Sequence, residues 1–201
     1  MRRPIRFEIL DEGFGGAPMV SFWSLDVQLQ RLLRLAIANV PARSIDRSGR
    51  PIALLATSYN AEDGCAPLAD ELEGVERALG LLDRAGYAIA VKQHPRERDG
   101  KYDALPAFRR AADLRVLDEQ TPIEAYFAAL WAPDVVVSLL SNALFTARVL
   151  FDLPVFLMPG RESGVPFNTV SEPVYARHVP GGLPTIDALP RVDHASVDHA
   201  P

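Results

Sequence analysis

Residues 51–95 read PIALLATSYNAEDGCAPLADELEGVERALGLLDRAGYAIAVKQHP, in which two strand patterns flank a helix pattern. The runs 52–56 and 87–91 are short, apolar and bounded by turn residues, as buried strands commonly are. Between them, apolar residues recur at the spacing of one helix face: Leu68, Leu72, Val75, Leu79 and Leu82. A helix that carries the chain from one strand to the next predicts that the two strands pair in parallel.

The same alternation continues beyond this unit. Further strands are predicted at 115–117, 135–140 and 155–158, with helices between and after them. The sequence TPIE at 121–124 has the form of a capping box, which predicts that a helix starts there. We therefore expect an α/β fold, with a Rossmann-like parallel sheet and flanking helices.

The two ends of the chain carry weaker patterns. Residues 5–10 are a strand candidate, and the helix predicted after them has Leu25, Leu29 and Leu32 on one face. Beyond Phe167 the pattern fades, and we expect residues 181–201 to form a loosely held tail.

Composition excludes several classes of function. The 201 residues carry a formal net charge of −5, which gives no basic field for nucleic acid or anionic lipid. Cys65 is the single cysteine, so no internal disulfide can form. No apolar stretch is long enough to span a bilayer, and the start MRRPIRFEIL lacks the apolar core of a secretory signal. These features predict a cytoplasmic protein, and a peripheral position at the inner face of the cell membrane stays open.

Polar clusters follow four of the predicted strands. They are Asp11-Glu12-Gly13, Thr57-Ser58-Tyr59-Asn60, His94-Pro95 and Ser141-Asn142. In an open parallel α/β sheet, ligands bind outside the carboxyl ends of the strands. The clusters are therefore the candidate site residues.

In this order, the motifs resemble those of bacterial sialyltransferases and polysialyltransferases. That family has an acidic-acidic-glycine motif, a later His-Pro pair and a serine pair, which correspond here to ILDEGFGG, VKQHPRE and VVVSLLSNAL. Asn142 stands at the second position of the serine pair. The segment LLATSYNAEDG and the helix after it are similar to the start of the donor-binding domain in polysialyltransferases. The resemblance covers most of residues 5–160.

The resemblance implies a fold and a chemistry. The fold is GT-B, in which two Rossmann-like domains face each other across a cleft, and this chain would be the C-terminal, donor-binding half. Residues 1–50 would be a hinge segment and helix with the acidic motif, 51–170 the Rossmann-like nucleotide-sugar-binding domain, and 171–201 the tail. The donor would be CMP-sialic acid and the acceptor a glycan, with no cofactor and no metal.

Ten residues precede the acidic motif. We therefore expect that an acceptor domain is missing from this chain, which would be a fragment or a protein that has lost that domain. On this view the isolated chain binds CMP but transfers little sialic acid.

The resemblance also implies a role for each cluster. Asp11 or Glu12 would be the general base that takes the proton of the acceptor hydroxyl. His94, as an imidazolium, would stabilise or protonate the leaving phosphate. The other site residues would contact the donor: Gly13, Thr57, Ser58, Pro95, Ser141 and Asn142. The last two stand at a predicted helix N-terminus, where backbone donors and the helix dipole favour an anion.

Each cluster also has a simpler interpretation. Asp-Glu-Gly is commonly a turn, and His94 before proline can simply end a strand. Ser141 and Asn142 are good N-caps whatever else they do. Glu124 has a sufficient role in the capping box, and residues 96–99 read as a solvated loop.

Three functions stay open from the sequence. The first is transfer of sialic acid from CMP-sialic acid to a glycan such as a cell-surface polysaccharide. The second is a non-catalytic or incomplete nucleotide-sugar-binding module. The third is a GT-B glycosyltransferase that uses another nucleotide sugar, such as a UDP-sugar. Binding of CMP compared with UDP and GDP separates the third from the first two.

Overall fold

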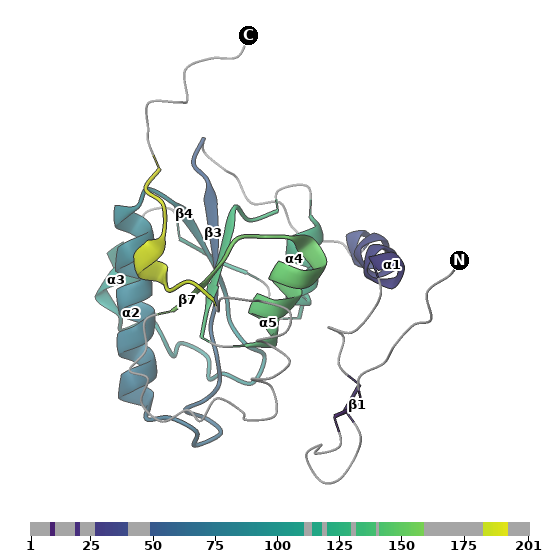
Figure 1. Ribbon diagram of the computed structural model, residues 1–201. Helices are drawn as coiled ribbons and strands as arrows, with labels where there is room; N and C mark the ends of the chain where they lie inside the picture. Colours follow the sequence, from purple (N-terminus) through teal and green to yellow (C-terminus); the bar gives the residue numbers. More distant parts are fainter. Residues whose placement is uncertain are drawn as a thin grey trace.

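A five-stranded sheet forms the centre of the computed structural model (Figure 1), which describes residues 9–10, 19–20, 27–39, 49–110, 114–117, 120–129, 132–139, 141–158 and 183–192. Its strands are β3 (Ile52–Ala56), β4 (Ala88–Lys92), β5 (Arg115–Val116), β6 (Val135–Ser138) and β7 (Val155–Leu157). All neighbouring strands in the order β5-β4-β3-β6-β7 are parallel. The predicted strands and their parallel pairing are confirmed, with small differences at the strand ends.

The strand order places a switch point in the middle of the sheet. From β3 the chain moves outward through β4 and β5, crosses back, and moves outward the other way through β6 and β7. This order is Rossmann-like, as predicted. In such sheets the ligand crevice lies outside the carboxyl ends of the strands at the switch point, here between β3 and β6.

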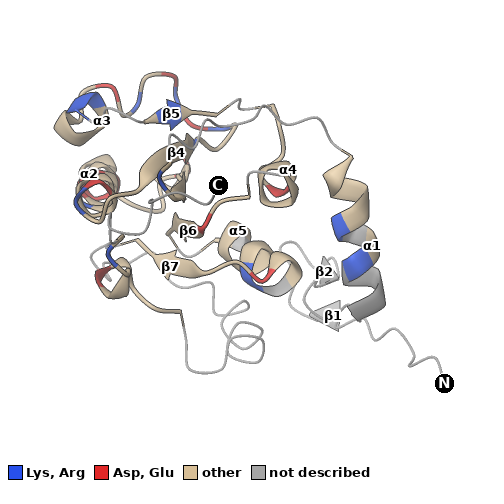
Figure 2. Cartoon of the chain, turned by 90° about the horizontal axis from the view of Figure 1, so that it is seen from above, with Lys and Arg blue, Asp and Glu red and all other residues tan. Residues whose placement is uncertain are grey.

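Helices cover both faces of the sheet (Figure 2). One face is covered by α2 (Leu68–Arg84), α3 (Pro106–Arg110) and the 3-10 turn η4 (Ile186–Ala188). The other is covered by α4 (Ile123–Ala128), α5 (Asn142–Phe145) and the π-helical turn η3 (Thr146–Leu150). None of the described helices is long and apolar enough to cross a membrane.

Alternate residues of β3 enter two separate cores. Ala53 and Leu55 pack beneath α2, whereas Ile52 and Leu54 pack beneath α4 and α5. Full burial of a leucine or isoleucine side chain stabilises a fold by roughly 1.5–3 kcal/mol. Because both faces of the sheet are covered, β3 is a continuous apolar run and does not alternate with polar residues.

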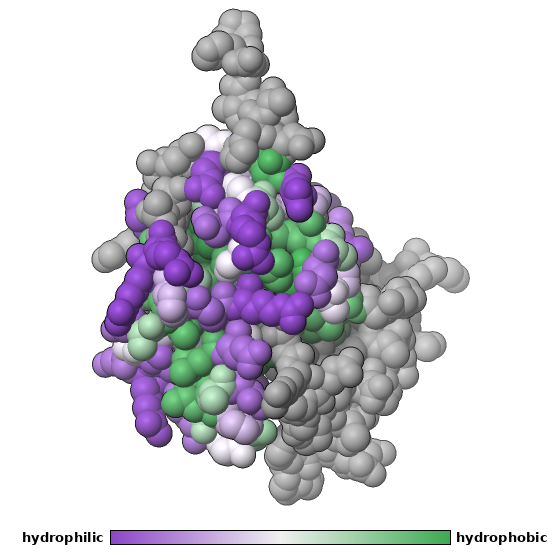
Figure 3. Space-filling view, turned by 90° about the vertical axis from the view of Figure 1, so that its left-hand side faces the viewer, coloured by the Kyte–Doolittle hydropathy of each residue, from purple (hydrophilic) through white to green (hydrophobic). Residues whose placement is uncertain are grey.

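The outer side of α2 is polar. Figure 3 views the molecule from the side on which α2 and α3 lie, and hydrophilic side chains cover much of that face. Four charged residues of α2 are exposed: Glu73, Arg77, Asp83 and Arg84. The helix is therefore amphipathic, with its apolar stripe on the sheet.

A proline and a glycine mark the two ends of α2. The helix begins after Pro67, which has extended backbone angles and stands at the N-cap. It ends at Ala85, and Gly86 follows with φ 90°, in the left-handed region that favours glycine. Proline at the start of a helix and glycine just after its end are common boundary signals, and both are present in the sequence here.

The start of α4 differs from the prediction. Its N-cap is Pro122, whose side chain makes no capping hydrogen bond. With φ −56° and ψ 142°, Pro122 is extended and lies outside the helix. The helix therefore begins one residue later than the capping box at 121–124 predicts, with proline at the capping position that the box assigned to Thr121.

The helix after β6 changes its pitch after one turn. α5 is followed directly by the π-helical residues of η3. Asp152 then has φ 53°, in the left-handed region, and its carboxylate pairs with Arg148 at 2.8 Å. The predicted helix is present, but only its first turn is α-helical.

Three described N-terminal elements lie outside the central sheet. β1 (Ile9–Leu10) pairs antiparallel with β2 (Met19–Val20), so the strand predicted at 5–10 has its partner in a separate two-stranded sheet. α1 (Val27–Ala38) packs on α4 and η3.

Residues 183–192 pack on the sheet, although the sequence predicts a loose tail beyond residue 181. Thr185 forms a parallel bridge with Leu157, and Ile186 is 1% exposed. The backbone N–H of Val192 donates to Ala85 O at 2.9 Å. Apolar residues recur here at every third position, at Leu183, Ile186, Leu189 and Val192. This pattern is the sequence feature that could have predicted the packing.

Candidate functional site

The carboxyl ends of β3, β4 and β6 meet at one edge of the sheet. In the strand register, Ala56 lies opposite both Lys92 and Ser138. The backbone N–H of Thr57 donates to Lys92 O at 3.1 Å, which extends the pairing one residue beyond β3. Three of the predicted clusters, which begin at Thr57, His94 and Ser141, therefore leave the sheet at the same edge.

The imidazole of His94 is held between two neighbours. Its ring lies 4.1 Å from the ring of Tyr59, centroid to centroid, and the two rings are inclined by 33°. Its Nδ1 accepts a hydrogen bond from the backbone N–H of Arg96 at 3.2 Å. The ring is half-buried and has a defined direction.

These contacts set the protonation of His94. A backbone N–H can only donate, so Nδ1 keeps its lone pair and the proton of the neutral ring is on Nε2. Burial lowers the pKa of His94, and the positive charges of Arg96 and Lys92 lower it further. Both effects favour a neutral ring in the free protein, and that ring offers Nε2–H as a donor.

Arg96 ties together the loops that follow β3 and β4. Its guanidinium lies over the Tyr59 ring, with Cζ 4.2 Å from the centroid, and its Nη2 pairs with Asp63 Oδ1 at 2.7 Å. The Arg96 side chain is 60% exposed. An exposed pair of this kind contributes about 0–1 kcal/mol, so the guanidinium can leave Asp63 at little cost.

The hydroxyl groups of Thr57 and Ser58 donate to protein carboxylates. Thr57 Oγ1 donates to Glu97 Oε2 at 2.6 Å, and Ser58 Oγ donates to Glu71 Oε1 at 2.5 Å. The sequence predicts that both residues contact the donor. In the structure their hydroxyl protons are directed at protein groups, while their oxygen atoms can still accept.

A buried ammonium connects these carboxylates. Lys101 Nζ lies 2.9 Å from Glu62, 2.9 Å from Glu71 and 3.4 Å from Glu97, and it donates to Ser58 O at 3.0 Å. The side chains of Lys101, Glu71 and Glu97 are 1–2% exposed. We call Lys101 and its three carboxylates the Lys101 cluster. It holds one positive and three acidic groups directly beneath the loops of the site.

Burial and hydrogen bonding act against each other in the Lys101 cluster. Burial would lower the pKa of Lys101, but hydrogen bonds to Glu62 and Glu71 outweigh it and raise that pKa. Burial raises the pKa of Glu97, and hydrogen bonds from Thr57 and Tyr102 oppose the rise. Hydrogen bonds within the cluster therefore offset the desolvation of Lys101, and donors from Thr57 and Tyr102 oppose that of Glu97.

Glu97 is the residue that the sequence interpretation missed. Residues 96–99 were interpreted as a solvated loop, and the structure shows that this is wrong for Glu97, which is buried. A related signal was present on α2, where Glu71 occupies the buried face that Val75 and Leu79 share. An acidic residue on an apolar helix face indicates a buried partner, here Lys101.

Pro95 has a clear role in the turn after β4. The backbone N–H of Glu97 donates to His94 O at 2.9 Å, which closes a four-residue turn. Pro95 is the second residue of this turn, where its fixed φ is favourable. Its ring is exposed, so the fold requires it for the chain direction and not for core packing.

The cluster after β6 consists of neutral hydroxyl groups. Ser138 is fully buried, and Ser141 Oγ donates to Ser138 Oγ at 3.1 Å. Ser141 O accepts a hydrogen bond from Leu144 N at 3.2 Å, as expected of the residue that precedes the helix. Asn142 is the first residue of α5.

The predicted general base belongs to a motif that the structure does not describe. Asp11, Glu12 and Gly13 lie outside the described residues, and their roles remain predictions. Within the described part of the chain, no three His, Cys, Asp or Glu side chains are grouped so that they could hold a metal ion.

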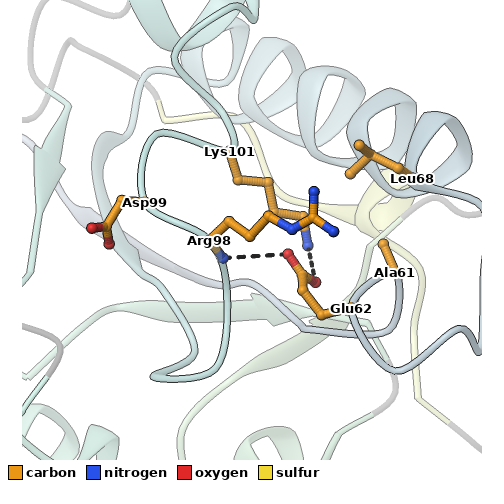
Figure 4. Close-up of a pocket in the computed structure, with 6 residues that line it drawn as sticks. All are labelled: Ala61, Glu62, Leu68, Arg98, Asp99 and Lys101. Atoms are coloured by element: carbon orange, nitrogen blue, oxygen red, sulfur yellow. Dashed lines mark hydrogen bonds and ion pairs between the residues drawn. The ribbon is translucent and has the colours of Figure 1, made fainter.

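A pocket of about 220 Å³ opens beside the Lys101 cluster. It is lined by Ala61, Glu62, Leu68, Arg98, Asp99 and Lys101 (Figure 4). The Glu62 carboxylate lies between Lys101 Nζ and the backbone nitrogen of Arg98, and the Asp99 side chain points away from the group. The wall combines charged groups with the apolar side chains of Ala61 and Leu68.

The fold and this edge define a Rossmann-like domain with its polar clusters at the sheet switch point. Residues 34–159 match the family model described as alpha-2,8-polysialyltransferase (POLYST). The match covers more than half of the chain and includes the clusters after β3, β4 and β6. The chain belongs to the alpha-2,8-polysialyltransferase family, which agrees with the resemblance found from the motifs.

The chain is also similar to curated proteins with another name. An ATP phosphoribosyltransferase regulatory subunit of Burkholderia vietnamiensis is 28% identical over 180 residues, which is 78% of this chain and 47% of that protein. The protein of the same name from Burkholderia ambifaria matches with the same identity and coverage. The chain thus spans about half the length of the curated relatives that it matches.

Proposed function

We propose that this chain binds CMP-sialic acid at the carboxyl edge of its parallel sheet and takes part in transfer of sialic acid to a glycan, such as a cell-surface polysaccharide. The observation that carries the proposal is that one family match, over residues 34–159, contains all three clusters that meet at this edge. Membership of this family supports a sialyltransferase, and the donor follows from that chemistry.

The edge offers suitable donors for a phosphate. The Nε2–H of His94 is a donor with a fixed direction, because Nδ1 is occupied by the N–H of Arg96. The guanidinium of Arg96 supplies a positive charge nearby and is held by an exposed ion pair. A phosphate bound beside His94 would accept a hydrogen bond from Nε2–H, and proton donation to the leaving group would require Nδ1 to give up its hydrogen bond from the Arg96 N–H and become protonated.

The transfer reaction can be written with these groups. The oxygen of an acceptor hydroxyl attacks the anomeric carbon of sialic acid, and the bond from that carbon to the CMP phosphate oxygen breaks. The electron pair remains on the phosphate, where His94 stabilises the developing charge. The acceptor proton goes to a carboxylate, for which Asp11 and Glu12 are the candidates. We propose no metal and no cofactor, because the leaving group is a monophosphate.

Titration calorimetry tests the nucleotide. We expect CMP to bind more tightly than cytidine, since the proposed phosphate contacts are absent for the nucleoside, and more tightly than UDP or GDP. A preference for UDP or GDP would show that the chain uses another nucleotide sugar. Failure of all four to bind would refute the donor site.

A transfer assay tests catalysis separately. The chain is incubated with CMP-sialic acid and an oligosialic acid acceptor, and the product is separated by chromatography. Transfer that is lost in His94→Ala supports the enzyme. CMP binding without transfer would instead support a non-catalytic or incomplete nucleotide-sugar-binding module.

A further inference from the structure

We propose that Glu97 is a positioning residue that fixes His94 for its contact with the donor phosphate. This inference rests on the proposed role of His94. Glu97 itself would not touch the donor, because its side chain is 1% exposed and lies in the Lys101 cluster.

Glu97 engages both backbone hydrogen-bonding groups of His94. Its carboxylate Oε2 accepts from the His94 N–H at 2.8 Å, and its own backbone N–H donates to His94 O at 2.9 Å. The peptide groups on both sides of His94 are thus fixed by one residue. The direction of the imidazole follows from this backbone position.

The same carboxylate connects His94 to the rest of the edge. Oε2 also accepts from Thr57 Oγ1 at 2.6 Å, so the ends of β3 and β4 share one acceptor atom. Oε1 accepts from the hydroxyl of the fully buried Tyr102 and lies 3.4 Å from Lys101 Nζ. The Glu97 carboxylate therefore accepts from four donors and is 1% exposed, so its position is fixed.

Charge balance does not explain why Glu97 is buried. Lys101 already has Glu62 and Glu71 at 2.9 Å, whereas Glu97 is farther away at 3.4 Å. A third buried carboxylate beside one ammonium carries a desolvation cost and repels the other two. The compensating contacts are the hydrogen bonds to Thr57, His94 and Tyr102, which points to a role in geometry.

Glu97→Gln is the sharpest change, because it keeps the shape and removes one acceptor. The His94 N–H and the Lys101 ammonium cannot become acceptors, and they lie on opposite oxygens of Glu97. Either orientation of the amide therefore places its NH₂ against a donor. Because the neutral amide oxygen is a weaker acceptor than a carboxylate, the hydrogen bond to the His94 N–H weakens even where it is kept, so the turn at His94 should loosen while the apolar cores stay intact.

The experiment compares CMP and cytidine binding in Glu97→Gln. We expect CMP affinity to fall roughly tenfold, as for loss of a charge-assisted hydrogen bond at the phosphate, while cytidine affinity stays within about twofold. An equal loss for both ligands would overturn the proposal, since it would indicate a general disturbance of the site.

Glu71→Gln is the matched control. Glu71 belongs to the same cluster and is equally buried, but it contacts Ser58, Ala61 and Lys101 and not His94. Both variants should lose stability, and only Glu97→Gln should change the ring signals of His94 in nuclear magnetic resonance spectra. The same change in His94 in both variants would refute a specific role of Glu97. Glu73→Gln, on the exposed side of α2, should behave as the wild type.

Two further measurements distinguish a failure of this inference from a failure of the proposed function. If the wild type binds no CMP, the donor assignment fails, but Glu97→Gln must still alter the His94 ring signals for the positioning role to stand. If Glu97→Gln does not fold, the wild type is titrated instead. The amide proton of His94 should then shift as the Glu97 carboxyl takes up a proton, and an amide signal independent of that step would overturn the inference.

Discussion

The loops after β3 and β4 and the loop after β6 meet at one edge but are stabilised in different ways. Beneath the first two, Lys101 and three carboxylates are buried and joined by hydrogen bonds. After β6, the described contacts are between two neutral serine hydroxyls, Ser138 and Ser141. The first region is a charged scaffold that supports His94, and the second is an uncharged strand end at the start of a short helix.

This difference shows how the edge can be both rigid and open to a ligand. The charged groups beneath β3 and β4 are directed at one another, so they hold geometry and offer little to an anion. The groups above them, Nε2 of His94 and the guanidinium of Arg96, are the ones that we propose bind the ligand. The two regions should therefore respond very differently to substitution.

Lys101→Met should have the largest effect on stability. It removes the ammonium and leaves three carboxylates together, which for a broken buried ion pair costs about 3–5 kcal/mol of the unfolding free energy. Denaturation in urea measures the change. Arg77→Met is the control, because its pair with Asp187 is more than half exposed and should contribute about 0–1 kcal/mol. Similar small losses in both variants would contradict a structural role for the Lys101 cluster.

His94→Ala should have the largest effect on transfer. Loss of one preorganised donor to a developing anion raises the barrier by about 2.7–4 kcal/mol, or roughly a hundredfold to a thousandfold in rate. The unfolding free energy should change little, because the ring is half-buried and lies outside both apolar cores. Normal transfer, or a variant that fails to fold, would show that the assigned role is wrong.

The comparison also explains what the sequence could predict. The continuous apolar runs of β3, β4 and β6 indicate strands covered on both faces, and helix spacing between them fixes the parallel order. The clusters at the strand ends follow from that order. Local pattern was therefore sufficient for the sheet and for the edge at which the clusters after β3, β4 and β6 meet.

The supporting contacts could not be predicted in the same way. Glu97 lies in a run of four charged residues, and only the fold brings it beneath Thr57, 40 residues earlier in the chain. Thr121 fits the first position of a capping box by residue type, but the N-cap in the structure is Pro122, which has an extended backbone. Contacts between distant loops and the backbone angles of a proline are not encoded in short motifs.

Ser141→Ala should have a moderate effect on both stability and binding. Loss of its hydrogen bond to Ser138 and of a serine before the helix should cost about 1 kcal/mol of the unfolding free energy. CMP binding should weaken more than cytidine binding if the hydroxyl contacts the phosphate. Equal weakening of both ligands would leave Ser141 with a structural role alone, and an unchanged stability would contradict even that role.

The smallest expected effect is the pH dependence of stability that His94 causes. Because burial lowers the pKa of His94 in the folded protein, the unfolded chain binds more protons between that folded pKa and the ordinary value of about 6.5. The contribution of the neutral ring is therefore present above about pH 6.5 and is lost as the pH falls through the folded pKa. Glu97 acts in the opposite sense, because its raised pKa favours the folded state at low pH and this contribution is lost as the pH rises through the folded pKa.

A comparison of the wild type with His94→Gln removes the contribution of Glu97, since both proteins contain that carboxyl. The urea midpoint of the wild type, relative to that of the variant, should decrease as the pH is lowered from 7 to 5. A constant difference between the two midpoints would mean that the ring is as solvated in the folded chain as in the unfolded one, and that the scaffold beneath β4 does not hold it.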